Sequence, residues 1–129
     1  MQKNLAALGA DRLAYLVLEL AKGNAGAKRR LRLELAGETG SGDVAREIRK
    51  RLTTIARSRS FINWQERNAF AADLDMQRRA IVSQVGPMDP TAAFDLIWRF
   101  LALANGAYER CDDSTGRVQS VFHEASDDL

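Results

Sequence analysis

The largest group of side chains that can do chemistry is basic and lies in the first half of the chain. It falls into two sets: Lys28, Arg29, Arg30 and Arg32, then Arg46, Arg49, Lys50, Arg51, Arg57 and Arg59. Lysine and arginine bind polyanions by neutralising phosphates and releasing counterions. If the helices carrying the two sets pack side by side, these cations form one binding patch. The residues assigned to this candidate site are Lys28, Arg29, Arg30, Arg32, Arg46, Arg49, Lys50 and Arg57.

A solvated face, or a surface complementary to an acidic protein, explains the same cations without any nucleic acid. No zinc-finger, RNA-reading or helix-turn-helix signature accompanies them in the chain. Polyanion binding is therefore the alternative prediction, not the leading one.

An acidic segment offers a second kind of chemistry, since hard cations bind several oxygen ligands. Its members are Glu109, Asp112 and Asp113, followed by Ser114. The segment lacks the Asp-x-Asp-x-Asp-Gly order and the final glutamate of an EF-hand loop. Capping of the last helix by Asp113 or Ser114 is the simpler interpretation. We predict no metal ion and no other cofactor.

Cys111 and His123 are the only thiol and the only imidazole, so they are the only such nucleophile and base that can be paired. Catalysis also requires a lowered thiol pKa, an orienting third residue and an oxyanion site, and none can be read from the sequence. One Cys and one His also exclude an internal disulfide and the common zinc frameworks. We predict a protein that is not an enzyme, with Cys111 in or near the core and His123 partly exposed.

The aromatic residues can stack on bases or on a ligand, but at helical spacing they are more typical of a core. The set is Phe61, Trp64, Phe70, Phe94, Trp98, Phe100 and Phe122. We assign it to the core, and Trp98→Ala is then expected to cost about 3–5 kcal/mol of stability.

Composition places these residues in a helical, globular chain. Its 129 residues fit one domain, and 46% apolar content with only two prolines favours helix over sheet. Residues 1–60 hold thirteen basic and six acidic side chains, and residues 61–129 hold six and eleven, so the two halves have opposite charge. The sequence shows no membrane-spanning run and no signal peptide, which predicts a cytoplasmic protein without membrane contact.

The stretch Pro90–Ala104, PTAAFDLIWRFLALA, is apolar on nearly every side of a helical wheel, which predicts a buried central helix. Asp89 is placed to cap its first turn, where Pro90 needs no hydrogen-bond partner. Asp95 and Arg99 can pair on its one polar stripe. Asn105 and Gly106 are expected to end the helix.

Five further helices are expected. The first runs from about 10 to 22 and buries Leu13, Leu16, Val17 and Leu20. The second follows its cap Asn24 to about 35, and a glycine-rich break spans 37–42. The third follows its cap Asp43 to about 58, with Val44, Ile48, Leu52 and Ile55 inward. The fourth covers 64–85, with Phe70, Leu74, Gln77, Ile81 and Val85 along one stripe. Ala69 and Ala80 in this helix are expected to allow close approach of a neighbouring helix. The last helix begins near Arg117 and buries Val118, Val121, Phe122 and Ala125.

Several phrases together resemble a family of uncharacterised bacterial proteins classified only as a domain of unknown function. The phrases are RLRLEL (30–35), SFINWQE (60–66), LIWRFLALA (96–104) and YERCDDSTGRVQSVFHEA (108–125), of which WRFLALA and ERCDDSTG are the most specific. The resemblance covers nearly the whole chain and implies an all-helical, repeat-like scaffold. It also implies that this chain is the N-terminal part of a longer protein, and it supplies no catalytic residue.

We therefore predict a single all-α domain over 1–129, with about six helices in a bundle or repeat-like array around the helix at 90–104. The leading function is a non-enzymatic scaffold or protein-interaction module with a protein partner or a second copy of itself. Polyanion binding is the alternative, and a small-molecule pocket between helices is a third possibility.

Overall fold

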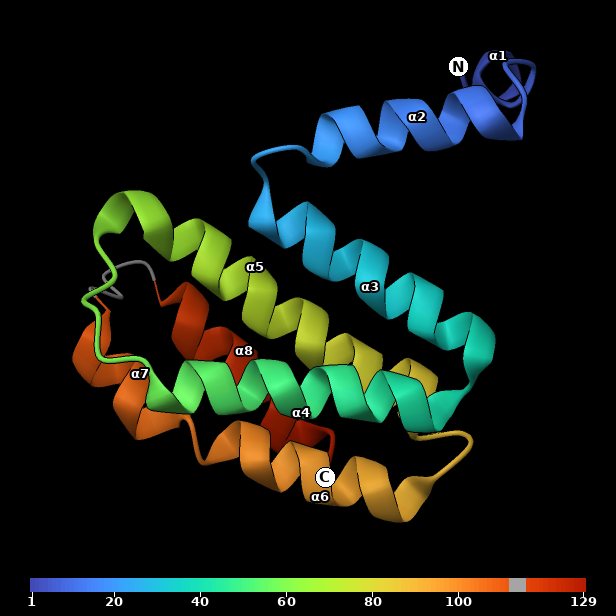
Figure 1. The fold of residues 1–129 in the computed structure, drawn as a ribbon. Coiled ribbons are helices and arrows are strands. Elements are labelled where there is room, and N and C mark those ends of the chain that lie inside the picture. The colour runs from blue at the N-terminus through green and yellow to red at the C-terminus, as the bar shows by residue number, and fades with distance from the viewer. Residues whose placement is uncertain (112–115) are drawn as a thin grey trace. The chain divides into compact units, whose positions relative to one another are not determined.

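The structure is a computed structural model that describes residues 1–111 and 116–129, and in these residues every regular element is helical. In chain order the elements are α1 (Gln2–Ala6), α2 (Ala10–Ala21), α3 (Ala25–Thr39), α4 (Ser41–Arg57), α5 (Trp64–Ala80), η1 (Ile81–Val85), α6 (Pro90–Leu101), α7 (Ala104–Arg110) and α8 (Arg117–Asp127) (Figure 1). An isolated bridge between Ile62 and Cys111 is the one extended pairing in the same residues. The predicted all-α fold is confirmed.

The chain divides into two compact units, residues 1–31 and residues 32–129, and each is considered by itself. In the first unit, α2 begins and ends close to the predicted bounds. Its apolar stripe is not buried, because Leu16, Val17 and Leu20 are 39%, 40% and 79% exposed. The prediction of a buried stripe is wrong, since so short a unit has too little chain to cover an amphipathic helix. The prediction of a single domain stays a prediction.

Asparagine and aspartate side chains set where several helices begin. The Ala27 amide donates to Asn24 Oδ1 at 3.0 Å, and the Ala92 amide donates to Asp89 Oδ1 at 3.1 Å. Each bond satisfies an amide that has no partner within its helix. Both caps were predicted. Asn63 caps α5 by accepting hydrogen bonds from two amides at its start, and this cap was not predicted.

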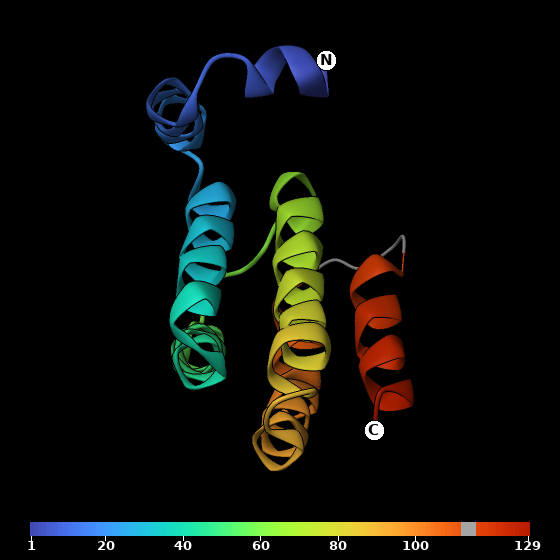
Figure 2. The same ribbon diagram turned by 90° about the vertical axis from the view of Figure 1, so that its right-hand side faces the viewer.

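Four helices and the π-helical turn η1 build the core of the second unit. α5 packs against α8, while α4 and α6 lie side by side and both contact η1 (Figure 1). Figure 2 views α4 nearly end-on beside α5, which shows that these two helices cross. The predicted inward residues of α4 and α8 are all buried: Val44, Ile48, Leu52, Ile55, Val118, Val121, Phe122 and Ala125.

The π-helical turn η1 continues α5 to the predicted end of the fourth helix. Its wider winding appears in the bond from the Gly86 amide to the Ile81 carbonyl, five residues back, at 2.9 Å. A Cβ at Gly86 would lie 2.8 Å from the Val82 carbonyl oxygen, closer than real Cβ contacts. Glycine at this position therefore lets the wide turn close before Pro87.

The central helix differs from its prediction in length and in burial. α6 ends at Leu101, and Asn105 lies within the following helix α7 instead of ending α6. Phe100 is fully buried, but Phe94 and Trp98 are each 55% exposed, so their assignment to the core is wrong. The physical reason is that α6 contacts α4, η1 and α8 on one side, which leaves the opposite side uncovered.

Other details of the prediction need correction. α3 continues through Gly37, and the break falls at Gly40, whose φ of 140° suits glycine. Asp43 lies inside the first turn of α4 and accepts a bond from Arg46, so it is not the cap. Ala69 is exposed and mediates no close packing, whereas Ala80 is buried as predicted. Phe61 and Trp64 are also exposed, so their assignment to the core is wrong, because they lie in the linker and first turn before α5.

Candidate functional site

Four of the predicted cations share one exposed side of α4, which we call the α4 basic stripe: Arg46, Arg49, Lys50 and Arg57. Arg49 and Lys50 follow Arg46 by three and four residues, and Arg57 follows Lys50 by seven, so all four return to the same side of the helix. The buried residues of α4, such as Ile48 and Leu52, occupy the opposite side. The basic stripe is therefore a continuous feature of the surface.

Local acids neutralise half of the α4 basic stripe. Arg46 pairs with Asp43 at 2.9 Å, and Lys50 approaches Glu47 at 3.5 Å. Within residues 1–111 and 116–129, the side chains of Arg49 and Arg57 make no ion pair or hydrogen bond. These two guanidinium groups are the cations of the stripe that are available to an external anion.

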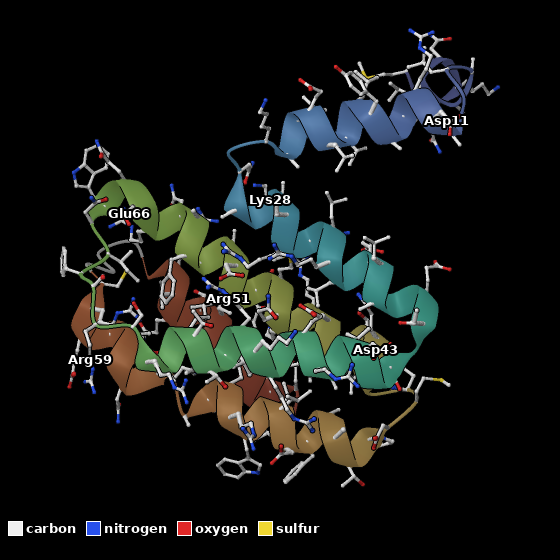
Figure 3. The ribbon with its side chains drawn as sticks, in the orientation of Figure 1. Asp11, Lys28, Asp43, Arg51, Arg59 and Glu66 are labelled. Atoms are coloured by element: carbon white, nitrogen blue, oxygen red, sulfur yellow. The ribbon has the colours of Figure 1, made fainter. Side chains whose placement is uncertain are left out.

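Arg51 and Arg59, which flank the stripe in sequence, lie elsewhere. Arg51 is on the side of α4 that faces α5 (Figure 3), where it binds the buried carboxylate of Asp73 at 2.7 Å. Gln77 donates to the same carboxylate at 3.4 Å, and its own Oε1 accepts no bond from the described residues. This buried pair joins α4 to α5. Arg59 is exposed beyond the end of α4.

The remaining predicted cations are divided between the units. Lys28, Arg29 and Arg30 belong to residues 1–31, and Arg32 belongs to residues 32–129. Lys28, Arg30 and Arg32 are exposed, and Arg29 is half-buried. Their merging with the α4 basic stripe into one patch stays a prediction.

The uncovered side of α6 carries a row of residues that we call the α6 aromatic face: Thr91, Phe94, Trp98 and Leu101. The rings of Phe94 and Trp98 meet edge to face, with centroids 6.2 Å apart and planes at 75°. This is a favoured aromatic geometry, so each ring restrains the other. Leu101, at the C-terminal end of the row, is half-buried and packs against the core, so the open part of the face is Thr91, Phe94 and Trp98.

One ion pair borders the α6 aromatic face. Asp95 accepts from Arg99 Nε at 3.1 Å, and both side chains are more than half exposed, which confirms the predicted pair. They are the only charged residues between Pro90 and Leu101. The face is therefore apolar along its centre, with a neutral charge pair along one flank.

A pocket of about 330 Å³ lies between the end of α4 and the α6–α7 junction. Ligand pockets start near this volume. Its walls combine apolar residues such as Ile55 and Leu103 with the polar residues Ser58, Arg59, Glu109 and Arg110. Arg110 donates to the Ile55 and Ser60 carbonyls at 3.1 and 2.9 Å, so its guanidinium holds the chain after α4 in place. The pocket thus follows from a structural contact, and small-molecule binding stays a prediction.

A second arginine, which sequence reasoning missed, ties α5 to α8. Arg78 contacts Asp75 at 2.9 Å, Glu124 at 2.9 Å and Asp128 at 2.8 Å. Its burial alone would lower the pKa of Arg78, but hydrogen bonds to Asp128 and Asp75 and their negative charges outweigh it. The pKa of Arg78 therefore lies above its ordinary value, and the side chain stays cationic throughout the neutral range.

The other residues considered for chemistry are Cys111, His123 and the acidic segment, and the structure describes only part of that segment. Cys111 is buried and His123 is exposed, as predicted. Glu109 is exposed, whereas Asp112 and Asp113 lie outside the described residues, so the metal prediction for that segment remains a prediction. Elsewhere in the described residues, no three His, Cys, Asp or Glu side chains gather into a metal-binding group. No described helix is long and apolar enough to cross a membrane.

The α6 aromatic face is another feature that sequence reasoning missed. Its residues belong to a helix that was predicted to be apolar on nearly every side and buried. Their spacing of three, four and three residues is itself the signal, since such a seam is typical of a helix that meets another helix. The buried residues Leu96, Ile97 and Phe100 form a separate row on the other side of α6.

Comparison with known proteins assigns a family to the chain and adds no activity. No curated protein and no solved structure matches the chain. One family model does match, and it covers residues 1–129, which confirms the resemblance seen in the sequence. The chain therefore belongs to a family of unknown function (DUF6880).

Proposed function

We propose that this chain is a non-enzymatic helical module that binds another protein through the α6 aromatic face. The observation that supports it is the exposure of Phe94 and Trp98, each at 55%, in a fixed edge-to-face pair. Tryptophan and other aromatic residues are enriched at the energetic centres of protein interfaces. Two rings already held in one geometry lose little conformational entropy on binding.

The arrangement of these residues distinguishes the face from ordinary exposed apolar side chains. Single exposed apolar residues are normal on protein surfaces. On α6 they follow one row over three helical turns, and a buried row lies behind them on the same helix. Contiguous apolar surface of this kind marks interaction sites. The helix thus presents one apolar side to its own core and a second to a partner.

Photo-crosslinking tests the proposal. Trp98 is replaced by a benzoylphenylalanine residue in the full chain, and Trp64, which is 65% exposed at the start of α5, is replaced in a matched control. We expect a protein adduct from position 98 and none from position 64. The adduct must disappear when Phe94→Asp is added, and the identified partner must bind the purified chain saturably. Equal adducts from both positions, or none from position 98, would refute the docking surface.

A second candidate, polyanion binding, is favoured by one observation on α4. Arg49 and Arg57 lie on one exposed stripe and have no partner in residues 1–111 or 116–129. Each free guanidinium can contact a phosphate and release a counterion. The other two cations of the stripe are already paired with acids and contribute less.

Fluorescence anisotropy with short labelled DNA and RNA, at low and near-physiological salt, tests this candidate. We compare R49A/R57A with R46A/K50A, since both variants remove two positive charges from the same stripe. Removing the unpaired arginines is expected to reduce the slope of log K against log salt by roughly 2, because about 0.9 counterion is released per phosphate. No binding by the wild type at low salt, or unchanged binding by R49A/R57A, would exclude the stripe as a site; equal losses in both variants would show that pairing with Asp43 and Glu47 does not withhold Arg46 and Lys50 from the anion.

A further inference from the structure

We propose that the pocket between the end of α4 and the α6–α7 junction, which we call the α4–α7 pocket, binds a small monocarboxylic acid. The apolar part of the ligand fills the pocket, and its carboxylate lies at the mouth beside Arg59 and Arg110. This inference goes beyond the proposed function and does not rest on it, because no residue of the α6 aromatic face lines the pocket. All residues that line it belong to the second unit, residues 32–129.

The interior of the α4–α7 pocket is apolar. Ile55, Leu103 and Ala107 line it, and all three are buried. The volume of about 330 Å³ is at the lower end of the range of ligand pockets, so the pocket admits a small molecule. Apolar walls with a few polar groups at fixed positions are the usual composition of such sites. The pocket therefore suits a ligand with a small apolar body and one polar end.

Gly106 contributes to the open volume of the pocket. It lies inside α7 and lines the pocket, and no atom lies within 4 Å of the position that a Cβ would take there. Glycine within a helix is less stable than alanine. Gly106 has neither a positive φ nor a crowded site that would require glycine. A long side chain at this position is therefore expected to occupy part of the pocket without disturbing the fold.

Arg110 supplies a fixed positive charge. Its guanidinium donates to the Ile55 and Ser60 carbonyls and, at 2.9 Å, to the Ser58 hydroxyl, so three of its five N–H groups are used. All three acceptors are neutral, and within residues 1–111 and 116–129 no carboxylate pairs with Arg110. Two N–H groups and the whole charge thus remain for an anion. Because the group is already held in place, it loses little conformational entropy on binding.

The other two charged residues of the pocket set the charge of the ligand. Arg59, just beyond α4 (Figure 3), and Glu109 in α7 make no ion pair or hydrogen bond through their side chains in the described part of the chain. With Arg110, the pocket holds two guanidinium groups and one carboxylate, which leaves a single positive charge in excess. A ligand with one negative charge balances this excess. A carboxylate also accepts two N–H groups of a guanidinium in the bidentate geometry that arginine favours.

An NMR titration of the isotope-labelled full chain tests the inference with benzoate, benzamide and benzamidinium, which share one shape and carry a negative, a neutral and a positive head group. We expect saturable shifts of the Ser58, Gly106 and Ala107 amides with benzoate, and a dissociation constant on the order of 1 mM for so small a ligand. Benzamide should bind about two- to fivefold more weakly, because a partly exposed charge pair contributes about this much, and benzamidinium more weakly still. Equal or tighter binding of either would overturn the assigned charge. No saturable shift with benzoate up to about tenfold above that constant would overturn the site.

Matched leucine substitutions test the location. Gly106→Leu is expected to weaken benzoate binding at least about tenfold, because its side chain overpacks the site of the ligand. The thermal unfolding temperature should stay unchanged or rise, because leucine favours helix more than glycine does. Gly42→Leu makes the same change at an exposed position within α4, where no atom lies within 4 Å of a Cβ either, and it should bind benzoate like the wild type. Equal binding of benzoate by both variants would overturn the site.

Removal of each unpaired charge tests the ligand class, while Arg110 is retained because it holds the chain after α4 in place. Arg59→Gln keeps a polar side chain and should weaken benzoate binding about two- to fivefold, with benzamide unaffected. Glu109→Gln should strengthen benzoate binding by a similar factor, because it removes a like charge. Unchanged benzoate binding by Arg59→Gln, or weaker benzoate binding by Glu109→Gln, would overturn the inference that the pocket selects a carboxylate.

Discussion

The contrast between Phe100 and Trp98 tests the orientation of α6, on which the proposed docking surface depends. Phe100 is fully buried and contacts the ring of Phe122 with centroids 5.2 Å apart. Its truncation in Phe100→Ala removes a whole core ring and leaves a cavity, which costs about 3–5 kcal/mol. A loss of this size is a large share of the stability of a small domain.

Truncation of Trp98, which lies two residues earlier in the same helix, should lower the free energy of unfolding much less. Because it is 55% exposed, Trp98→Ala loses about half of the 1.5–3 kcal/mol that full burial of a large apolar side chain provides. Loss of the edge-to-face contact with Phe94 adds about 0.5–1 kcal/mol. We expect a total of about 1–2.5 kcal/mol, below the roughly 3–5 kcal/mol that a core position would give.

Urea unfolding followed by circular dichroism at 222 nm measures both values. The protein concentration is kept at a few micromolar, so that association does not contribute. Equal m-values in both variants and the wild type show that the same transition is compared. If Trp98→Ala destabilises the chain as much as Phe100→Ala, Trp98 is a core residue and α6 is oriented differently.

Three further predictions concern the contacts that shape the second unit, each measured by urea unfolding. Gly86→Ala should destabilise by about 1–3 kcal/mol, because its Cβ overlaps the Val82 carbonyl oxygen, and a neutral effect would contradict the π-helical turn. Asp89→Ala should cost about 1 kcal/mol by removing the cap of α6, while Asp89→Asn should retain most of it. Arg78→Ala should cost about 1–3 kcal/mol, since it removes the described partner of the partly buried Asp128 carboxylate, whereas Asp75 keeps its pair with Arg79. If Asp128→Ala costs as much in the Arg78→Ala background as it does alone, the contact contributes no stability.

Local chemistry explains why most helix positions could be predicted. Asn24 and Asp89 begin helices wherever the rest of the chain lies, because each bonds an amide three residues away. The inward rows of α4 and α8 were also predicted correctly, since one side of each helix is apolar and the other polar. A helix with a single apolar side leaves no choice about which side is buried.

The candidate site was predicted less well, for two physical reasons. The α4 basic stripe follows from helical periodicity, but sequence alone does not show that Asp43 and Glu47 neutralise two of its cations and leave Arg49 and Arg57. Which acid pairs with which cation depends on side-chain rotamers and distances, and one sequence is compatible with several such pairings. Arg51 was grouped with these cations, although it turns to a carboxylate 22 positions away in the chain.

The sequence by itself therefore determined the fold class, most helix starts and the buried rows of α4 and α8. Only the tertiary structure decided which side of α6 meets the core. Leu96, Ile97 and Phe100 face α4, η1 and α8, and the equally apolar side with Phe94 and Trp98 is left open. The reason is that a helix apolar all round has no local preference between its sides. The number and position of its neighbours, set by contacts distant in the chain, make that choice.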